Sequence, residues 1–366
     1  MTNKNAWLNV LSSLAVIVLG LLIGFVVLLL SDATNAPAAF ETILTFGFSS
    51  MRNMGDVLLF ATPIILTGLS VAFAYKTGLF NIGASGQFTM GAFVAVYVGV
   101  QFTFLPGPVR ILVSIVGATI AGALWGAIPG LLKAYRNVNE VIACIMTNYI
   151  AMFLVNYLVI THIFDQGRGT SLPLPADSNL PPAGLDLIFR DAIRASNVNL
   201  GLFIAIGVAI LVYIVLEKTT FGYELKAGGF NKDAAKYAGI NGERNIVRSL
   251  MISGGIAGIA GGLNYMAGTG LSMSIIDTLA TEGFTGISVA FLGLNHPIGI
   301  IFSGIFVSSL YLGGARLQVF GFSIEIVEIV MSVIIYFCAF VFLVKSQLEG
   351  RLKKMAGKKA PTGGES

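Results

Sequence analysis

Six polar side chains and one aromatic ring that could line a cavity with them stand inside long apolar stretches of this sequence. They comprise four amides, one carboxylate, one hydroxyl and one aromatic ring: Asn81, Gln87, Asn148, Asn156, Glu282, Ser288 and Phe291. A polar group is costly in an apolar medium, so each is a functional candidate. A cavity lined by such groups suits a neutral, hydrogen-bonding solute, and no buried cationic cluster offers a site for a strong anion. The alternative for each amide is a hydrogen bond between two helices.

A second candidate is the polar segment 217–247, which lies between two apolar stretches. Within it, residues 231–238 are typical of a short helix with Asn231 as N-cap and Asp233 in the first turn. Three alanines form a small face, and Gly239 is expected to end the helix. Such a helix could dock in a groove of a soluble partner. The alternative is an ordinary hydrated loop.

The sequence offers little for catalysis. His162 and His296 are far apart, and Cys144 and Cys338 stand in apolar runs, so we expect buried thiols and neither catalytic residues nor a metal site. No G-x-x-x-x-G-K-[ST] segment is present. We therefore expect no cofactor in this chain. If ATP drives its function, ATP and Mg²⁺ must bind to a separate ATPase subunit.

The composition is that of an integral membrane protein. Hydrophobic residues make up 55% and charged residues 11%, with a mean hydropathy of +0.85. Soluble domains carry about 25% charged residues. So few charges cannot cover a water-facing surface, but they suffice for one that faces lipid. We expect the lipid bilayer, and no nucleic acid, as a partner.

Apolar stretches long enough to form membrane helices recur along the chain, since a span needs about 20 residues. We predict an all-α fold with ten spans, of which the eighth is short and polar enough to be broken or tilted: 7–30, 56–75, 81–101, 109–132, 140–161, 199–216, 248–268, 281–294, 298–316 and 323–345. The N-terminal stretch exceeds the length of a signal peptide's apolar region and is predicted to be a retained helix.

Lysine and arginine placement predicts the orientation of these spans. With both termini in the cytoplasm, 16 of the 22 basic residues, including every lysine, lie on the inner side. The expected parts are a first helix at 1–30, a transmembrane domain at 56–345 and a basic tail at 347–366. The domain includes an outer loop at 162–198, with a short interfacial helix near 184–194, and the inner loop at 217–247.

Small residues recur at four-residue spacing in three of the expected spans. One series is Gly254, Gly258 and Gly262, and a second runs from Ala118 through Gly122 and Gly126 to Gly130; the third comprises Gly83, Gly91, Ala95 and Gly99, with Gln87 in its path. Each series places a smooth ridge on one helix face, where another backbone can approach. We expect close helix packing at the first two.

Three motifs, in this order, resemble a known family. The sequence Asn-Ile-Gly-Ala-Ser-Gly-Gln at 81–87 resembles a signature of ABC importer permeases of the ribose, branched-chain amino acid and nucleoside type. The segments 228–240 and 283–297 resemble the family's coupling-helix motif and its eighth-span segment. The resemblance implies that the following residues couple to the ATPase: Gly228, Gly229, Asn231, Asp233, Ala234, Ala235, Tyr237, Gly239 and Ile240. It implies that the seven polar-site candidates line the translocation path.

Segments 139–150 and 282–295 are most similar to the nucleoside (simple sugar) branch, although Ser85 stands where that branch often has Glu. This resemblance implies two related halves, a bacterial cell-membrane location and three kinds of partner. They are a cytoplasmic ATPase pair, a second permease subunit, which we expect to be a homologous different chain, and an extracellular substrate-binding lipoprotein. Nucleosides are the expected solute.

Two other functions remain open from the sequence. The chain could be an ABC permease for a sugar such as ribose or galactose. It could also be an ion-coupled secondary transporter, in which Asp277, Glu282 and Glu328 relay protons. A membrane enzyme would need a clustered catalytic set, which the sequence does not contain.

Overall fold

The computed structural model describes residues 3–338 and 340–348. It confirms the all-α prediction, since two short strands are the only sheet in this part of the chain. The helices and strands are α1 (Asn3–Ser31), α2 (Ala36–Thr45), η1 (Phe46–Phe48), α3 (Met51–Lys76), α4 (Ala84–Gln101), α5 (Gly107–Arg136), α6 (Glu140–His162), β1 (Phe164–Asp165), β2 (Thr170–Ser171), η2 (Ala176–Ser178), α7 (Leu185–Ile188), α8 (Gly201–Lys218), α9 (Thr220–Phe230), α10 (Lys232–Tyr237), α11 (Gly242–Tyr265), α12 (Thr281–Leu292), α13 (Pro297–Gly314), η3 (Leu317–Phe320) and α14 (Ile324–Cys338).

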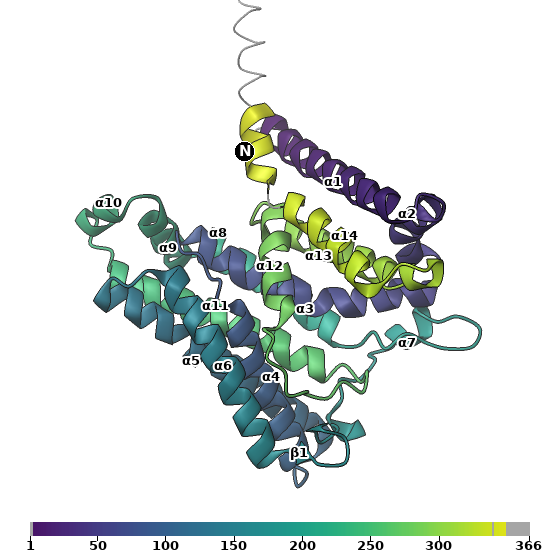
Figure 1. The fold of residues 1–366 in the computed structure, drawn as a ribbon. Coiled ribbons are helices and arrows are strands. Elements are labelled where there is room, and N and C mark those ends of the chain that lie inside the picture. The colour runs from purple at the N-terminus through teal and green to yellow at the C-terminus, as the bar shows by residue number, and fades with distance from the viewer. Residues whose placement is uncertain (1–2, 339, 349–366) are drawn as a thin grey trace, which may run out of the picture. The chain divides into compact units, whose positions relative to one another are not determined.

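The chain divides into two compact units. The smaller unit comprises Met1–Thr42 and Gly314–Ser366, and the larger comprises Ile43–Gly313. In the smaller unit α1 packs along α14 (Figure 1), and Gly20 and Gly24 of α1 face Ile334 of α14 at close range. Small side chains let the two apolar helices approach. The expected basic tail at 347–366 lies almost entirely outside the described residues.

In the larger unit, α3 lies at the centre (Figure 1), and every residue from Ala61 to Ala74 is buried. Ser50 caps its start by accepting a hydrogen bond from the Asn53 amide. Helices α11, α12 and α8 pack against α3, and α4 and α5 pack against α11. Because α3 is apolar around its whole circumference, it can be buried on all sides.

The two glycine series meet each other between α5 and α11. A methyl group added to Gly258 would lie 2.2 Å from the Ala118 carbonyl oxygen, and one added to Gly254 would lie 2.3 Å from that of Gly122. Gly91 of α4 also faces the Gly258 backbone. These contacts confirm the predicted close packing, because nothing larger than hydrogen fits between the backbones.

Eight helices in the described part of the chain are long and apolar enough to span a membrane. The other two expected spans, 81–101 and 281–294, also form helices, namely α4 and α12. With 12 residues, α12 is about 18 Å long. A bilayer core is about 30 Å thick, so α12 by itself is too short to cross it. This agrees with the short eighth span in the sequence, and whether that span is broken or tilted stays a prediction.

Large apolar side chains follow a helical stripe on the exposed face of α5. They are Leu112, Val116, Ile120 and Leu124, each four residues from the next. Apolar side chains on α6 are exposed in the same manner, including Ile142, Met146, Ile150 and Phe153. Faces of this kind are stable against lipid or another apolar helix.

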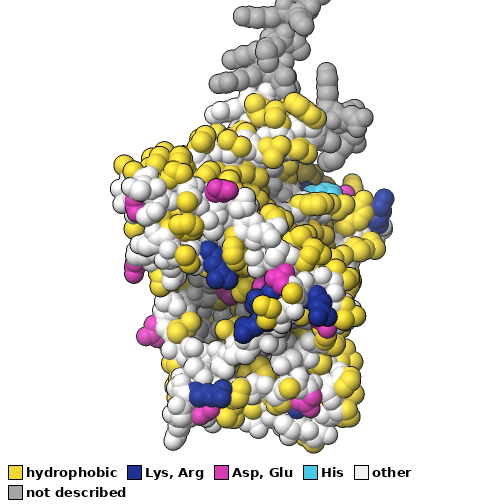
Figure 2. All heavy atoms as spheres, turned by 90° about the vertical axis from the view of Figure 1, so that its right-hand side faces the viewer, with side chains coloured by type: hydrophobic (Ala, Val, Ile, Leu, Met, Phe, Trp, Pro, Cys, Tyr) yellow, Lys and Arg dark blue, Asp and Glu magenta, His cyan; other side chains and the backbone are white. Residues whose placement is uncertain are grey.

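The outer loop differs from its prediction. Instead of an interfacial helix near 184–194, it contains the four-residue α7, because Gly184 precedes α7 with a positive φ and a bridge between Arg190 and Ala195 turns the chain back. A hairpin of β1 and β2 was not expected at all. Figure 2, which views the side where α7 lies, shows acidic and basic side chains among hydrophobic ones.

An ion pair anchors this loop to the membrane helices. Arg110, in the first turn of α5, is 1% exposed, and its guanidinium donates to the carboxylate of Asp177 in η2. The Ser178 hydroxyl donates to the Gly99 carbonyl, 3.0 Å away. A guanidinium is buried only when it is paired, so the charge holds η2 at the start of α5.

The inner loop is more helical than expected. Residues 220–230 form α9, and Gly228 and Gly229 lie inside this helix although the sequence placed them in a loop. The Thr219 side chain caps α9 by accepting from the Gly222 amide. Gly222 packs directly on the last turn of α8, so α9 folds back sharply from it.

Candidate functional site

Asn81 and Gln87 lie in a buried hydrogen-bond network between three helices. Asn81 Nδ2 donates to Gln87 Oε1 at 2.8 Å and to Ser253 Oγ of α11 at 2.6 Å, while Gln87 Nε2 donates to Asn81 Oδ1 at 3.1 Å. The Ser253 hydroxyl reaches the Ser70 carbonyl of α3 at 2.8 Å. The network therefore ties the short segment before α4 to α3 and α11.

Asn148 of α6 binds the start of α4. Its Oδ1 accepts from the Gly86 amide at 2.8 Å, and its Nδ2 donates to the Ile82 carbonyl at 3.0 Å. The Asn148 side chain thus satisfies the Gly86 N–H, which the first turn of a helix leaves without a partner, and also binds the segment before α4. Asn156, about two turns further along the same face of α6, donates to the Ile276 carbonyl and is half-buried.

These contacts give the amides the interhelical role that the sequence left open as their alternative. Asn81, Gln87 and Asn148 are each at most 1% exposed and fully engaged. Their place on a translocation path therefore stays a prediction, and their direct effect is to fix the position of α4.

The other three candidates lie on α12. Glu282 and Ser288 are half-buried, and the start of α12 packs on the start of α4, where Gly283 faces the Ser85 backbone. The Ser85 hydroxyl donates to the Ala280 carbonyl at 2.9 Å. Ser85, which stands where the nucleoside branch often has Glu, thus links the start of α4 to the start of α12.

At the opposite end of α12, Phe291 joins an aromatic cluster. Its ring centroid is 5.5 Å from that of Tyr75 and 6.0 Å from that of Phe80. The nearby His296 begins the turn into α13, and burial lowers its pKa, as does Lys76, while Glu217 acts against them. The imidazole is therefore neutral at neutral pH.

The structure confirms the helix expected at 231–238. Asn231 Oδ1 accepts from the amides of Asp233 and Ala234, both at 3.0 Å, and α10 follows. Gly239 has a φ of 80°, and its amide donates to the Lys236 carbonyl, which ends the helix. Ala235 is the buried member of the small face, while Ala234 and Ala238 are exposed.

Two aromatic rings next to and within α10 are exposed to an unusual degree. Phe230 is 89% exposed and Tyr237 is 95% exposed. Buried aromatic rings are the strongest contributors to protein interfaces, and solvated ones at a loop tip gain stability when a partner covers them. This segment therefore has the composition of a docking surface.

The chain matches one family of permeases over most of its length. Residues 53–339 match the family described as the branched-chain amino acid transport system / permease component. This chain belongs to that permease family.

Relatives of the permease are transport subunits. It is 35% identical to the guanosine ABC transporter permease protein NupP of Bacillus subtilis, over 94% of this chain and 97% of the relative. It is 33% identical to the nucleoside ABC transporter permease protein NupB of Lactococcus lactis, over 95% of both. It is 31% identical to the glucose ABC transporter permease protein TsgB13 of Haloferax volcanii, over 91% and 87%.

Bacillus subtilis has a second relative of the permease. It is the guanosine ABC transporter permease protein NupQ, 28% identical over 72% of this chain and 82% of the relative. No solved structure matches the permease.

Sequence reasoning missed several residues that complete the site. Ser70 and Ser253 supply the hydroxyls of the buried network. Gly78 lies in the turn between α3 and α4 (residues 77–83, the α3–α4 turn), where the inner loop packs against it. A methyl group on Gly229 of α9 would lie 2.7 Å from the Gly78 backbone nitrogen. Ser253 could have been identified from the sequence, because it immediately precedes Gly254 in the small-residue series. No sequence pattern identified Gly78.

The permease thus has a continuous line of contacts from α10 to its centre. Helix α9 leads directly into α10 and touches the α3–α4 turn through Gly229. In that turn, the Thr77 hydroxyl lies 2.5 Å from the Ser249 hydroxyl of α11, and Asn81 follows within a few residues. A displacement of α10 would therefore pass to the segment before α4 through direct contacts between residues.

Proposed function

We propose that this permease is the membrane-spanning subunit of an ATP-driven importer of nucleosides. The chain is an ABC transporter permease by family, and near-complete coverage by NupP and NupB supports nucleosides as the solute class. The site is compatible with this solute because the candidate path residues on α12 present a hydroxyl and an aromatic ring.

The observation that carries the mechanism is the contact between Gly229 of α9, the helix that leads into α10, and the α3–α4 turn. An ATPase bound to Phe230 and Tyr237 would move α10 when it closes on ATP. Gly229 would then displace the turn at Gly78, and the network around Asn81 would pass that displacement to α4 and α11. The spans at 199–216 and 248–268 flank the coupling segment, since α8 precedes α9 and α11 follows α10. Specificity in this scheme is shared with the binding protein that delivers the solute.

The assembly includes four kinds of component. A second permease subunit completes the path, and the coexistence of NupP and NupQ in one bacterium supports a homologous but different chain. A cytoplasmic ATPase pair binds ATP and Mg²⁺, and an extracellular lipoprotein delivers the solute to the outer side. The complex lies in a bacterial cell membrane, where the apolar stripes of α5 and α6 face lipid or the second subunit.

A sugar is the second candidate solute, and one observation favours it. TsgB13, a glucose permease, is 31% identical over most of both chains. The polar groups on α12 alone do not separate a nucleoside from a sugar, because both are neutral and rich in hydroxyls.

The solute is tested by reconstituting the permease with its second subunit, ATPase and binding protein, taken from the neighbouring genes. We expect ATP-dependent uptake of radiolabelled guanosine, which unlabelled nucleosides suppress and a hundredfold molar excess of glucose or ribose does not. Uptake of glucose without uptake of any nucleoside would replace the proposed solute by a sugar.

A further inference from the structure

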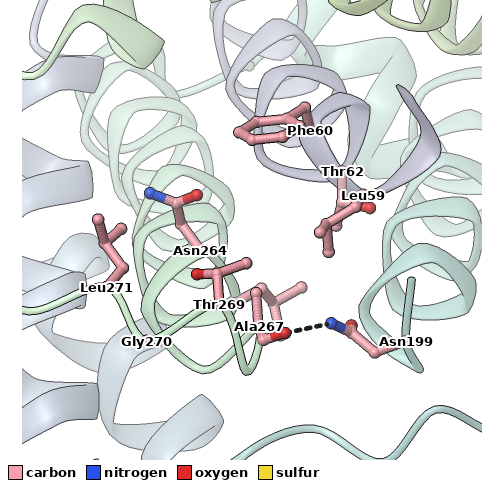
Figure 3. Close-up of a pocket in the computed structure, with 10 residues that line it drawn as sticks. Leu59, Phe60, Thr62, Asn199, Asn264, Ala267, Thr269, Gly270 and Leu271 are labelled. Carbon is pink, nitrogen blue, oxygen red and sulfur yellow. Dashed lines mark hydrogen bonds between the residues drawn. The ribbon is translucent and has the colours of Figure 1, made fainter. Parts of the chain in front are cut away.

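A pocket of about 300 Å³ lies in the larger unit between α3, α11 and the segment that follows α11. Figure 3 shows the side chains of Phe60, Asn264 and Thr269 around the same space. Leu59 and Leu271 provide apolar walls. Its volume falls at the lower end of the range for small-molecule sites, which is about 300–1,000 Å³.

The pocket retains its shape because its floor is tied down by another amide. Asn199 Nδ2 donates to the Ala267 carbonyl at 3.1 Å, which Figure 3 shows as a dashed line, and Asn199 Oδ1 accepts from the Gly201 amide at 2.9 Å. The start of α8 and the end of α11 are thereby joined. The pocket is thus preorganised by a side chain that is itself satisfied.

Two polar groups in the pocket are available to a ligand. The half-buried Asn264 amide and the exposed Thr269 hydroxyl have no hydrogen-bond partner among the residues that the structure describes. An amide in an apolar span that is not used between helices is a costly feature, which a ligand would offset. The residues lining the pocket carry no charge, so a neutral ligand fits it.

The pocket lies at the outer ends of α3 and α11 in the orientation that the basic residues predict. Phe60 is in the first half of α3, which begins outside, and Asn264 is next to the last residue of α11, which ends outside. This is the side on which an extracellular binding protein would release its solute. The pocket therefore lies where an importer first receives its cargo.

We propose that this pocket is the outer acceptance site for a neutral nucleobase, an inference that rests on the proposed nucleoside function. The Phe60 ring, 50% exposed, offers a stacking face to a planar base. The Asn264 amide can donate to and accept from one base edge, and Thr269, which lines the same pocket, offers a hydroxyl to the ribose. A sugar alone would use the hydroxyl-binding groups but has no planar base edge to pair with the Asn264 amide.

The test uses the complete importer in membranes and 8-azidoguanosine as a photolabel. The label is expected to attach within residues 59–62 or 263–271, and excess guanosine should prevent it. The Asn264→Leu variant should reduce both labelling and guanosine uptake about tenfold, because two hydrogen bonds to the base edge are lost. Phe60→Ala should have a similar effect, and Phe60→Tyr should restore uptake.

Asn197→Leu is the matched control, because Asn197 is an exposed outer amide that does not line the pocket. It should leave labelling and uptake unchanged. Labelling elsewhere, or labelling that persists in Asn264→Leu and Phe60→Ala, would overturn the acceptance site. If the unmodified importer does not take up guanosine at all, the proposed nucleoside function fails instead.

Discussion

Replacing Gly229 with alanine is expected to reduce guanosine uptake about tenfold while ATP hydrolysis continues, which is within the 5- to 150-fold range of coupling between two sites. The added methyl group would lie 2.7 Å from both the Gly78 nitrogen and the Thr77 carbonyl carbon. Neither backbone atom can move aside alone, so α9 must separate from the α3–α4 turn. The measurement is the number of solute molecules imported per ATP hydrolysed in the reconstituted complex.

Gly228→Ala provides the matched control for this contact: the family resemblance includes Gly228 among the coupling residues, but no atom lies within 4 Å of a methyl group added there. Both substitutions replace the same residue type in the same helix, and only one meets the turn. Gly228→Ala should keep the normal ratio of import to hydrolysis. Equal ratios in the two variants would show that the contact between Gly229 and Gly78 does not transmit movement.

The Gly258→Ala variant is expected to lose about 3 kcal/mol of stability, at the upper end of the usual range for overpacking. Its methyl group would lie 2.2 Å from the Ala118 carbonyl oxygen and 3.0 Å from the Gly122 Cα. Helix α5 would have to move away from α11 along its length. We expect poor yield and a sharply lower Tm of the complex in detergent.

Gly255→Ala tests whether this loss comes from the contact or from the glycine itself. Gly255 is in the same helix, and its added methyl group would lie 3.4 Å from Thr119 atoms, an ordinary contact. Alanine also favours helix by about 1 kcal/mol over glycine. The Tm of Gly255→Ala should therefore match or exceed that of the unchanged protein, and a Tm as low as that of Gly258→Ala would contradict this reading of the packing.

The sequence predicts the helices of this permease well because each apolar span must satisfy its own backbone in lipid. The helix at 231–238 was equally predictable, because Asn231 and Gly239 are local capping signals that do not depend on distant contacts. Glycine spacing predicted where backbones come close. The spacing could not say that Gly258 meets both Ala118 and Gly91, because partner choice depends on the tertiary fold.

Other features depend on contacts between distant residues and could not be predicted. The helical state of 220–230 is one, because Gly228 and Gly229 disfavour a helix locally while the Thr219 cap and the packing of Gly222 on α8 support it. The outer loop is another, since Arg110 and Asp177 are 67 residues apart. For the site, the sequence identified Asn81 and Gln87 as polar groups in a span but gave no sign that they bind each other.

The most direct test is guanosine uptake into vesicles that contain the whole complex, with the ATPase subunit either active or unable to hydrolyse ATP. In the proposed mechanism a separate ATPase drives the permease through α10. Uptake should therefore require internal ATP and an active ATPase, and it should be unaffected when proton and sodium gradients are collapsed. Uptake driven by either gradient in vesicles that hold this chain alone would contradict the account.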